Sequence, residues 1–371
     1  MNASSTFAAQ AVLDSVSDGL YVTDVSREII YWNDAAERMT GWSAADIIGK
    51  RCYDDVLCHV DKDGHRLCGE EFCPLHRAIV TGQSSTVPFV VFARHKNKSE
   101  RVPLRVSVAP VRARSGKVIG GVETFRDASH EVRDINRAKA IQSLSLQREL
   151  PQDPRVRFRV QYIPHDVIGG DYYAVAPLDS DRYGFLLADV TGHGVPAALY
   201  TMFLRSLWES TNALLTEPGE FARSMNEHLC HLIREAEPFA AGVCGVLDLT
   251  NKRLRLVGAG NPSPFLIRAD GVWQHLDAAG FPFGMLGEAD YEEHVVEVSS
   301  GDCLLFYSDG AVEIRTPAGS LLGVEGLEKV LKALGYPLAE VELAAVEQEL
   351  LACSDCIRLE DDLTLFEIRI S

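Results

Sequence analysis

The first third of the chain carries the alternation of apolar and polar positions that half-buried strands require. Between residues 102 and 109, apolar side chains at every second position alternate with Arg105, Ser107 and Ala109, which is the period of a strand with one buried face. Further extended runs are predicted at 19–23, 29–32, 87–94 and 118–125, with a helix at 35–39. Turn residues separate these runs, so residues 8–127 are expected to form one compact unit.

Residues 128–154 follow a different pattern. The stretch as far as Leu150 is charged and free of Pro and Gly, and its apolar residues recur at three-residue steps. Such steps drift around a helix, so they predict a connecting helix, ended by Pro151 and Pro154, without establishing a long heptad coiled coil. Two interpretations stay open: the helix couples a sensor to an effector, or it is a spacer.

Residues 155–371 mix strands and helices. Strands are predicted at 183–190, 253–257, 302–307 and 363–370, and helices at 196–208, 218–235 and 341–351. The length of 371 residues suits two or three domains of ordinary size. We therefore expect an α+β protein in which a helix joins two domains.

Composition and charge disfavour several classes of protein. The 46% of hydrophobic residues suffice for more than one core, and the net charge of −17 disfavours a nucleic-acid binder or a binder of anionic membranes. No apolar run approaches the about 18 residues that span a bilayer, and residues 1–13 lack the Lys and Arg of a signal peptide. These features predict a cytoplasmic protein with no membrane or nucleic-acid partner.

Aspartates at the ends of predicted strands stand out in the C-terminal part. Asp171 follows two glycines, and Asp189 and Asp309 each end an apolar run. Asp361 and Asp362 precede the last strand. Each alone is an ordinary turn or cap residue, but several carboxylates without compensating Lys or Arg would repel one another strongly. A bound divalent cation resolves that conflict, and an all-oxygen set favours Mg²⁺ or Mn²⁺ over Zn²⁺.

The motifs around these aspartates resemble those of the metal-dependent (PPM, or protein phosphatase 2C-like) serine/threonine phosphatases. Their order and spacing fit the bacterial branch of stage II sporulation protein E and the sigma-B regulatory phosphatases. The matching motifs are Gly169-Gly-Asp171, Ala188-Asp-Val-Thr-Gly-His-Gly-Val-Pro-Ala-Ala198, Gly258-Ala-Gly-Asn-Pro-Ser-Pro264, Phe281-Pro-Phe-Gly-Met285, Tyr307-Ser-Asp-Gly310 and Asp361-Asp-Leu-Thr364.

The resemblance implies an αββα sandwich over residues 155–371 that holds two Mn²⁺ or Mg²⁺ ions between its sheets. Asp189 would bridge the two ions, helped by the backbone carbonyl of Val190. Asp309 and Asp361 would complete one metal site, and Asp171 would serve the other. The ions would activate a water for attack on phosphorus, with no covalent protein nucleophile.

His193, in the motif after Asp189, has two open interpretations. Its imidazole could protonate the departing serine alkoxide, or it could only shape the turn. A different class also begins its signature with Gly-Gly-Asp, the cyclic-dinucleotide synthases. That class leaves the motifs of Asp189, Asp309 and Asp361 unexplained.

Residues 8–127 resemble a PAS sensor domain, an antiparallel sheet with helices. The matching segments are Ser17-Asp-Gly-Leu-Tyr-Val-Thr-Asp24, Ile30-Tyr-Trp-Asn-Asp-Ala-Ala-Glu37, Thr40-Gly-Trp-Ser43 and Ile47-Ile-Gly-Lys50. The resemblance implies ligand sensing or dimerisation without naming a ligand. The Asn-Cys-Arg motif of flavin-binding PAS domains is absent from the sequence.

Four cysteines cluster in the PAS-like region: Cys52, Cys58, Cys68 and Cys73. Four thiolates could bind Zn²⁺ or an iron–sulfur cluster. Their spacings, with 5, 9 and 4 intervening residues, match no standard zinc-ribbon or ferredoxin pattern. Three interpretations stay open: a metal or cluster site, a redox pair, and plain structural thiols.

Together the two resemblances imply a cytoplasmic, PAS-regulated serine/threonine protein phosphatase. The implied substrate is a phosphorylated STAS-domain anti-sigma-factor antagonist in a bacterial partner-switching pathway, and we expect a homodimer. The alternatives are a non-catalytic module that captures a phosphoprotein, and a ligand or redox sensor whose phosphatase fold is vestigial.

Overall fold

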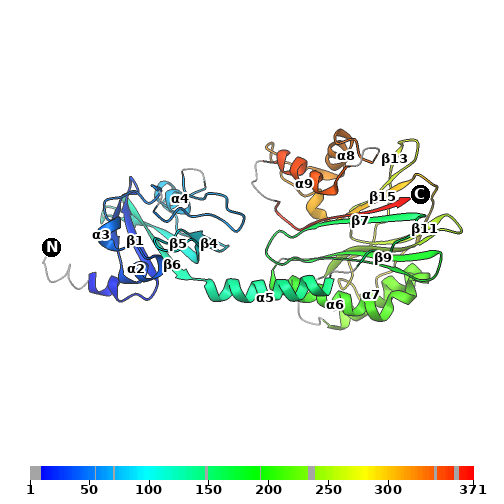
Figure 1. The fold of residues 1–371 in the computed structure, drawn as a ribbon, viewed down its shortest axis with the longest axis horizontal. Helices are drawn as coiled ribbons and strands as arrows, with labels where there is room; N and C mark the ends of the chain where they lie inside the picture. The colour runs from blue at the N-terminus through cyan, green and yellow to red at the C-terminus, as the bar shows by residue number, and fades with distance from the viewer. Residues whose placement is uncertain are drawn as a thin grey trace. The chain divides into compact units, whose positions relative to one another are not determined.

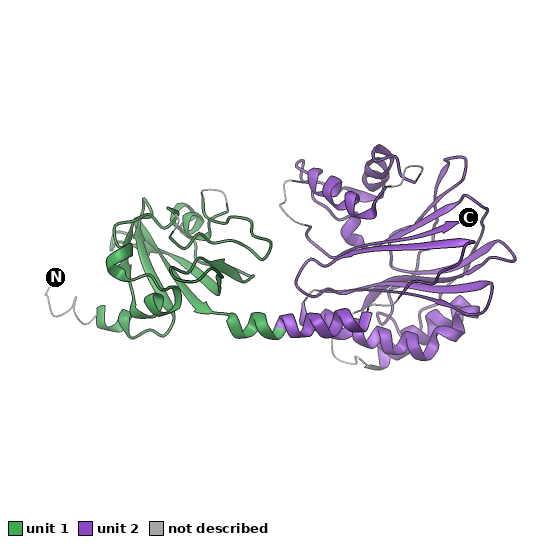
Figure 2. Cartoon of the chain, in the orientation of Figure 1, with its two compact units in different colours: residues 1–134 green, residues 135–371 purple. Residues whose placement is uncertain are grey.

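The computed structural model describes residues 10–54, 56–69, 72–146, 149–192, 194–232, 239–337, 341–354 and 359–371. The chain divides into two compact units, residues 1–134 and 135–371 (Figure 2). The division falls inside a helix, α5 (Ser129–Leu146), where the sequence predicts a connecting helix. None of the helices in the described ranges combines the length and the apolar character needed to cross a membrane.

The first unit is an antiparallel sheet with short helices. Its strand order is β2-β1-β6-β5-β3, and β4 also pairs with β5. In chain order the elements are β1 (Gly19–Asp24), β2 (Ile29–Trp32), α2 (Asp34–Thr40), α3 (Ala44–Ile47), α4 (Pro74–Thr81), β3 (Ser85–Thr86), β4 (Val91–Ala93), β5 (Val102–Arg112) and β6 (Val118–Asp127). The predicted antiparallel sheet with helices is confirmed.

Local sequence accounts for most of these boundaries. The Asn33 side chain accepts a hydrogen bond from the Ala36 amide and so starts α2, and Gly41 ends it in the left-handed region, with φ of 73°. The strand predicted over 87–94 is shorter than expected, because only Val91–Ala93 pair as β4. Pro88 has no amide hydrogen for a ladder, and this interrupts the strand.

The second unit contains two five-stranded antiparallel sheets. Their strand orders are β14-β11-β10-β9-β8 and β13-β12-β15-β16-β7. The strands are β7 (Val156–Ile163), β8 (Asp171–Pro177), β9 (Arg182–Val190), β10 (Ala240–Asp248), β11 (Arg253–Ala259), β12 (Phe265–Ile267), β13 (Trp273–His275), β14 (His294–Glu297), β15 (Cys303–Tyr307) and β16 (Leu363–Ile370). The helices are α6 (Val195–Thr211), α7 (Pro218–Leu232), α8 (Gly323–Ala333) and α9 (Leu343–Ala352), with short 3₁₀ helices at Asn212–Thr216 and Asp309–Ala311.

The two sheets are stacked, with α6 and α7 outside the first and α8 and α9 outside the second (Figure 1). Between the sheets the rings of Phe185, Phe306 and Phe366 lie 4.9–5.9 Å apart and are fully buried. Trp208 of α6 and Phe221 of α7 pack edge to face in the layer beneath the first sheet. The predicted αββα sandwich is therefore confirmed.

Candidate metal centre

Five aspartates, Asp171, Asp189, Asp309, Asp361 and Asp362, gather where the two sheets of the second unit meet, and we call them the aspartate cluster. Asp171 opens β8 and lies directly opposite Asp189 of β9 in the antiparallel register. Asp309 comes just after β15, in the other sheet. Asp361 and Asp362 come just before β16, which pairs with β15 in that sheet. The stacking of the two sheets therefore brings together residues that are nearly 200 positions apart in the sequence.

Asp171 is held from the opposite sheet. The hydroxyl of Thr364, in β16, donates a hydrogen bond to Asp171 Oδ2 at 2.5 Å, and both residues are buried. The Thr364 amide donates to Ser308 Oγ at 2.9 Å, and that hydroxyl donates to the carbonyl of Asp362 at 3.1 Å. Because this network is buried and directional, it fixes the Asp171 carboxyl relative to both sheets.

The neighbouring Asp361 and Asp362 have different surroundings. Asp362 Oδ1 accepts a hydrogen bond from the amide of His165 at 2.6 Å, and its Oδ2 accepts one from the amide of Gly170. Asp362 therefore fastens the segment that leads into Asp171. Asp361 is half-buried, and its Oδ1 accepts from the Asp362 amide at 2.8 Å.

Two glycines let the backbone approach the cluster. A Cβ at Gly169 would lie 1.9 Å from the Tyr162 hydroxyl and 2.6 Å from Asp362 Oδ2. A Cβ at Gly310 would lie 2.1 Å from the Asp362 carbonyl oxygen. All three distances are shorter than van der Waals contact, so glycine is required at each position by space alone.

Burial and mutual repulsion perturb the acidities of the cluster strongly. Burial, reinforced by the charges of Asp171 and Asp309, raises the pKa of Asp189 to about 11. Burial and the Asp361 charge raise the pKa of Asp309 to about 6, and burial with the Asp362 charge raises the pKa of Asp171 well above its ordinary value. Without a cation, Asp171, Asp189 and Asp309 are therefore harder to ionise than ordinary aspartates.

The cluster fits a divalent cation better than it fits bound protons. Asp171 Oδ1 and Asp309 Oδ1 are both buried and, within the described part of the chain, have no hydrogen-bond partner, which is costly for a carboxyl oxygen. A cation between the carboxylates would satisfy these oxygens and cancel the repulsion. Oxygen-only donors suit Mg²⁺ or Mn²⁺.

Four of the predicted site residues, Asp171, Asp189, Asp309 and Asp361, come together in the structure. Val190 follows Asp189 at the end of β9, and its carbonyl oxygen would lie 2.9 Å from a Cβ at Gly170. His193 lies outside the described residues. Thr364 lies in one of the recognised motifs, but the sequence predicts no role for it. Ser308 and Tyr162 are likewise not predicted to be part of the site.

The four cysteines of the predicted cluster, Cys52, Cys58, Cys68 and Cys73, all lie in the first unit and within the described residues. All four are free thiols. Burial raises the pKa of Cys68 to about 12 and that of Cys52 further above its ordinary value, so these two sulfurs are held as thiols, which are poor metal ligands.

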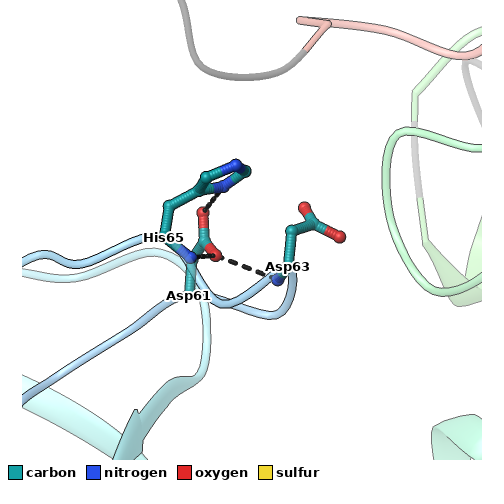
Figure 3. A group of neighbouring side chains, drawn as sticks. All are labelled: Asp61, Asp63 and His65. Carbon is teal, nitrogen blue, oxygen red and sulfur yellow. Dashed lines mark hydrogen bonds and ion pairs between the residues drawn. The ribbon is translucent and has the colours of Figure 1, made fainter.

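In a loop of the first unit, Asp61, Asp63 and His65 each offer a potential metal-ligand atom, and these atoms lie within 4.8 Å of one another (Figure 3). Asp61 is buried, and its Oδ1 accepts hydrogen bonds from the amides of Asp63 and His65, each at 2.9 Å. Its Oδ2 lies 3.0 Å from Nδ1 of His65. Both oxygens of Asp61 are thus used to close the loop, and the group is explained as a turn.

Family models match both units. A model described as Stage II sporulation protein E matches residues 179–371, and a PAS domain model matches residues 17–130. Phosphoserine phosphatase RsbP of Bacillus subtilis is 29% identical over 185 residues, which are 49% of this chain and 45% of RsbP. Phosphoserine phosphatase RsbU of the same organism is 24% identical over 307 residues, covering 82% of this chain and 88% of RsbU. The chain thus matches less than half the length of RsbP but most of RsbU.

Solved structures share the fold. The SiaA-PP2C domain of Pseudomonas aeruginosa superposes with a TM-score of 0.55 at 21% identity, covering 66% of this chain and 100% of that domain. The PP2C phosphatase domain of SpoIIE from Bacillus subtilis, with a fragment of its regulatory domain, gives a TM-score of 0.51 at 17% identity, covering 78% of this chain and 79% of that one. At these identities the likeness concerns the fold alone.

The fold, the aspartate cluster and these matches define a PAS domain followed by a phosphatase domain of the PP2C type, a class that uses Mn²⁺ or Mg²⁺. The chain belongs to the stage II sporulation protein E family, whose model matches more than half of its residues. Both resemblances expected from the sequence are therefore confirmed.

Proposed function

We propose that the chain is a PAS-regulated, metal-dependent serine/threonine protein phosphatase. The observation that carries the proposal is the aspartate cluster: buried carboxyl oxygens of Asp171 and Asp309 lack partners among the described residues, and burial, followed by a neighbouring carboxylate, raises the pKa values of Asp171, Asp189 and Asp309. Similarity to RsbP and RsbU, both named phosphoserine phosphatases, supports the same activity. A binding module or a vestigial enzyme would not need to keep these costly groups together.

In this proposal the chain's own residues hold two Mn²⁺ or Mg²⁺ ions. Asp189, helped by the Val190 carbonyl at the end of β9, would be the ligand shared by the two ions; Asp309 and Asp361 would hold one ion and Asp171 the other. Bound metal supplies a nucleophilic water and neutralises charge on the phosphoryl group. Thr364 and Asp362 hold the segments that carry the proposed ligands, so these segments need little reorganisation when the ions bind.

The substrate we propose is a phosphorylated STAS-domain anti-sigma-factor antagonist of a bacterial partner-switching pathway. The support is similarity to the sigma-B regulatory phosphatases, including RsbU over most of its length. We further propose a homodimer that works in the cytoplasm, with a PAS sensor at residues 8–127, a linker at 128–154 and the phosphatase domain at 155–371.

Helix α5 supplies the physical route by which the PAS domain acts. Near its start, Glu131 pairs with Arg105 of β5, with Arg105 Nε 3.2 Å from Glu131 Oε2. Near its end, the buried Gln142 donates hydrogen bonds to the Gly169 carbonyl at 2.8 Å and to Thr201 of α6 at 3.0 Å. A shift of the helix would therefore move Gly169, two residues before Asp171, and this favours a coupling role over a spacer.

The role of Cys52, Cys58, Cys68 and Cys73 stays a prediction in three forms: a Zn²⁺ or iron–sulfur site, a redox pair, or structural thiols. Zinc and iron content of the purified chain separates the first from the others. Because Cys52 and Cys73 are buried in the core of the first unit, we favour structural thiols.

Phosphate release from a phosphoserine STAS protein in the presence of Mn²⁺ tests the proposed activity. Wild type should turn over, and Asp189→Asn and Asp309→Asn should each lose at least about a hundredfold in rate, because each removes a metal ligand. Asp179→Asn is a matched control, because Asp179 is an exposed aspartate of the same domain that pairs with Arg182. Substrate capture by folded, metal-loaded wild type without turnover would instead support the binding-module alternative.

A further inference from the structure

Tyr162, in the phosphatase domain, buries a hydroxyl group that no hydrogen bond among the described residues accounts for. Tyr162 lies in β7 directly opposite Thr364 of β16 in the antiparallel register, so both side chains emerge on the same face of the sheet. Thr364 uses its hydroxyl to hold Asp171. The Tyr162 oxygen is buried and has no hydrogen-bond partner among the residues that the structure describes.

This hydroxyl points at the aspartate cluster. It lies 1.9 Å from the place where a Cβ on Gly169 would sit, and Asp362 Oδ2 lies 2.6 Å from the same place. The two oxygens therefore flank one face of Gly169, which has no side chain between them. Burial raises the pKa of the Tyr162 phenol, and the carboxylates that raise it further are Asp362 first and Asp171 next.

An unpaired, buried hydroxyl at this place lowers the stability of the fold, so its presence requires an explanation. A buried tyrosine oxygen normally has a partner, and leaving one without a partner costs about 1–3 kcal/mol. A phenylalanine would fill the same space without that cost. Asp171 Oδ1, in the same cluster, also lacks a partner among the described residues, and the Asp171 charge acts on the Tyr162 phenol. The cluster thus contains one unsatisfied donor and one unsatisfied acceptor.

We propose that Tyr162 is a positioning residue of the metal centre, whose hydroxyl donates into the carboxylate shell formed by Asp171 and Asp362 when a cation is bound. The inference rests on the proposed metal-dependent function. A hydroxyl donor stabilises ionised carboxylates far more than neutral ones, so its contribution is made in the metal-loaded state. Groups that orient metal ligands in this way typically contribute about 10- to 100-fold to metal affinity.

The test is the Mn²⁺ affinity of the full chain, measured by calorimetry, together with the unfolding temperature of the metal-free chain. Tyr162→Phe should weaken Mn²⁺ binding about tenfold and leave the metal-free unfolding temperature unchanged or higher. Tyr183→Phe is the matched control, because the Tyr183 hydroxyl donates to Asp153 at 2.7 Å, outside the cluster. That variant should lower the metal-free unfolding temperature and leave Mn²⁺ affinity unchanged.

The possible outcomes separate this inference from the function on which it rests. Wild type that binds Mn²⁺ no better than Asp189→Asn overturns the metal centre and the role of Tyr162 with it. Wild type that binds while Tyr162→Phe binds within twofold of it overturns only the role of Tyr162. A lower metal-free unfolding temperature with unchanged affinity would assign the tyrosine a packing role and also overturn it. As a second measurement, the ¹³Cζ resonance of Tyr162 in wild type should shift when Mg²⁺ is added.

Discussion

Both units of the protein bury carboxyl groups, and they do so in opposite ways. In the PAS domain, Glu123 of β6 is a single buried carboxyl: its Oε2 accepts a hydrogen bond from the Tyr21 hydroxyl at 2.9 Å, and its Oε1 lies 3.6 Å from Nε2 of His59. In the phosphatase domain several carboxyls face one another in the aspartate cluster. In both places burial raises the pKa, to about 8 for Glu123 and to about 11 for Asp189.

The difference lies in what can neutralise each group. One proton makes Glu123 neutral and suits its neighbours, because Tyr21 and His59 are themselves uncharged in the core; burial lowers the pKa of His59 to about 4. In the aspartate cluster the largest charge effects on the pKa values of Asp171, Asp189 and Asp309 come from other carboxyls, and one cation can neutralise several carboxylates at once. The PAS carboxyl is thus suited to a proton, and the aspartate cluster to a metal ion.

The largest expected effect is on the stability of the metal-free phosphatase domain. Asp309 and Asp189 have pKa values raised to about 6 and about 11, so their contribution is fully favourable below about pH 4 and is lost as pH rises through those values. The metal-free domain should lose stability from pH 4 upward, and Mn²⁺ should remove most of that loss. Calorimetric unfolding of the full chain across pH, with EDTA or with Mn²⁺, measures both curves.

Asp189→Asn sharpens that test because its effect changes sign with metal. Without metal the variant should unfold about 5 °C or more above wild type at pH 8, since it removes a repelled carboxyl. With Mn²⁺ the order should reverse, because only wild type gains binding energy. A variant that is less stable than wild type under both conditions would contradict the account of the cluster.

The next effect concerns the PAS domain. Glu123 has a pKa raised from 4.5 to about 8, so its contribution is lost as pH rises through 8, and His59 has a pKa lowered from 6.5 to about 4, so its contribution is lost as pH falls through 4. The two oppose each other up to pH 6.5. Between pH 6.5 and 8 only Glu123 acts, so wild type should lose about 1.4 kcal/mol of stability per pH unit.

Glu123→Gln should abolish that slope. Amide hydrogen exchange of β1 and β6 in the full chain at pH 6.5 and 8, corrected for intrinsic rates, measures it. Glu131→Gln is the matched control: Glu131 is partly exposed, its pairing with Arg105 lowers its pKa, and it does not titrate in this range. A slope that survives in Glu123→Gln would show that another group takes up the proton.

The same comparison explains what the sequence could predict. Asp189, Asp309 and Asp361 could be predicted from the sequence because each lies at a strand end, in a motif whose glycines or apolar runs are visible along the chain. Glu123 and His59 were not found, because they are 64 positions apart and nothing local distinguishes a buried Glu in a strand from an exposed one. Their pairing depends on the register of β1 with β6 and on the loop that carries His59.

Within the site, the limit was similar. The Asp361-Asp-Leu-Thr364 motif was recognised, but the role of Thr364 depends on the stacking of β16 against β8 across the two sheets. Helices α3, α4 and α8 were not predicted, and neither were several strands of the sandwich, among them β7, β8 and β10. The strand at 87–94 is shorter than predicted, because Pro88 interrupts it. Patterns along the chain thus predict elements and ligands, whereas contacts across the sandwich require the packed structure.

The smallest expected effect concerns Gln142, and it decides between the two interpretations of α5. Its side chain is a buried link from the helix to the Gly169 carbonyl, next to the Gly170 amide that Asp362 holds. Gln142→Ala removes one hydrogen bond to that segment, worth about 1 kcal/mol, or about fivefold in an equilibrium constant. The Mn²⁺ concentration for half-maximal phosphatase activity should therefore rise about fivefold. Gln152→Ala, which alters an exposed glutamine that donates to the nearby Leu150 carbonyl, should leave it unchanged. If Gln142→Ala has the metal requirement of wild type, α5 is a spacer, and the PAS domain must act on the aspartate cluster by another route.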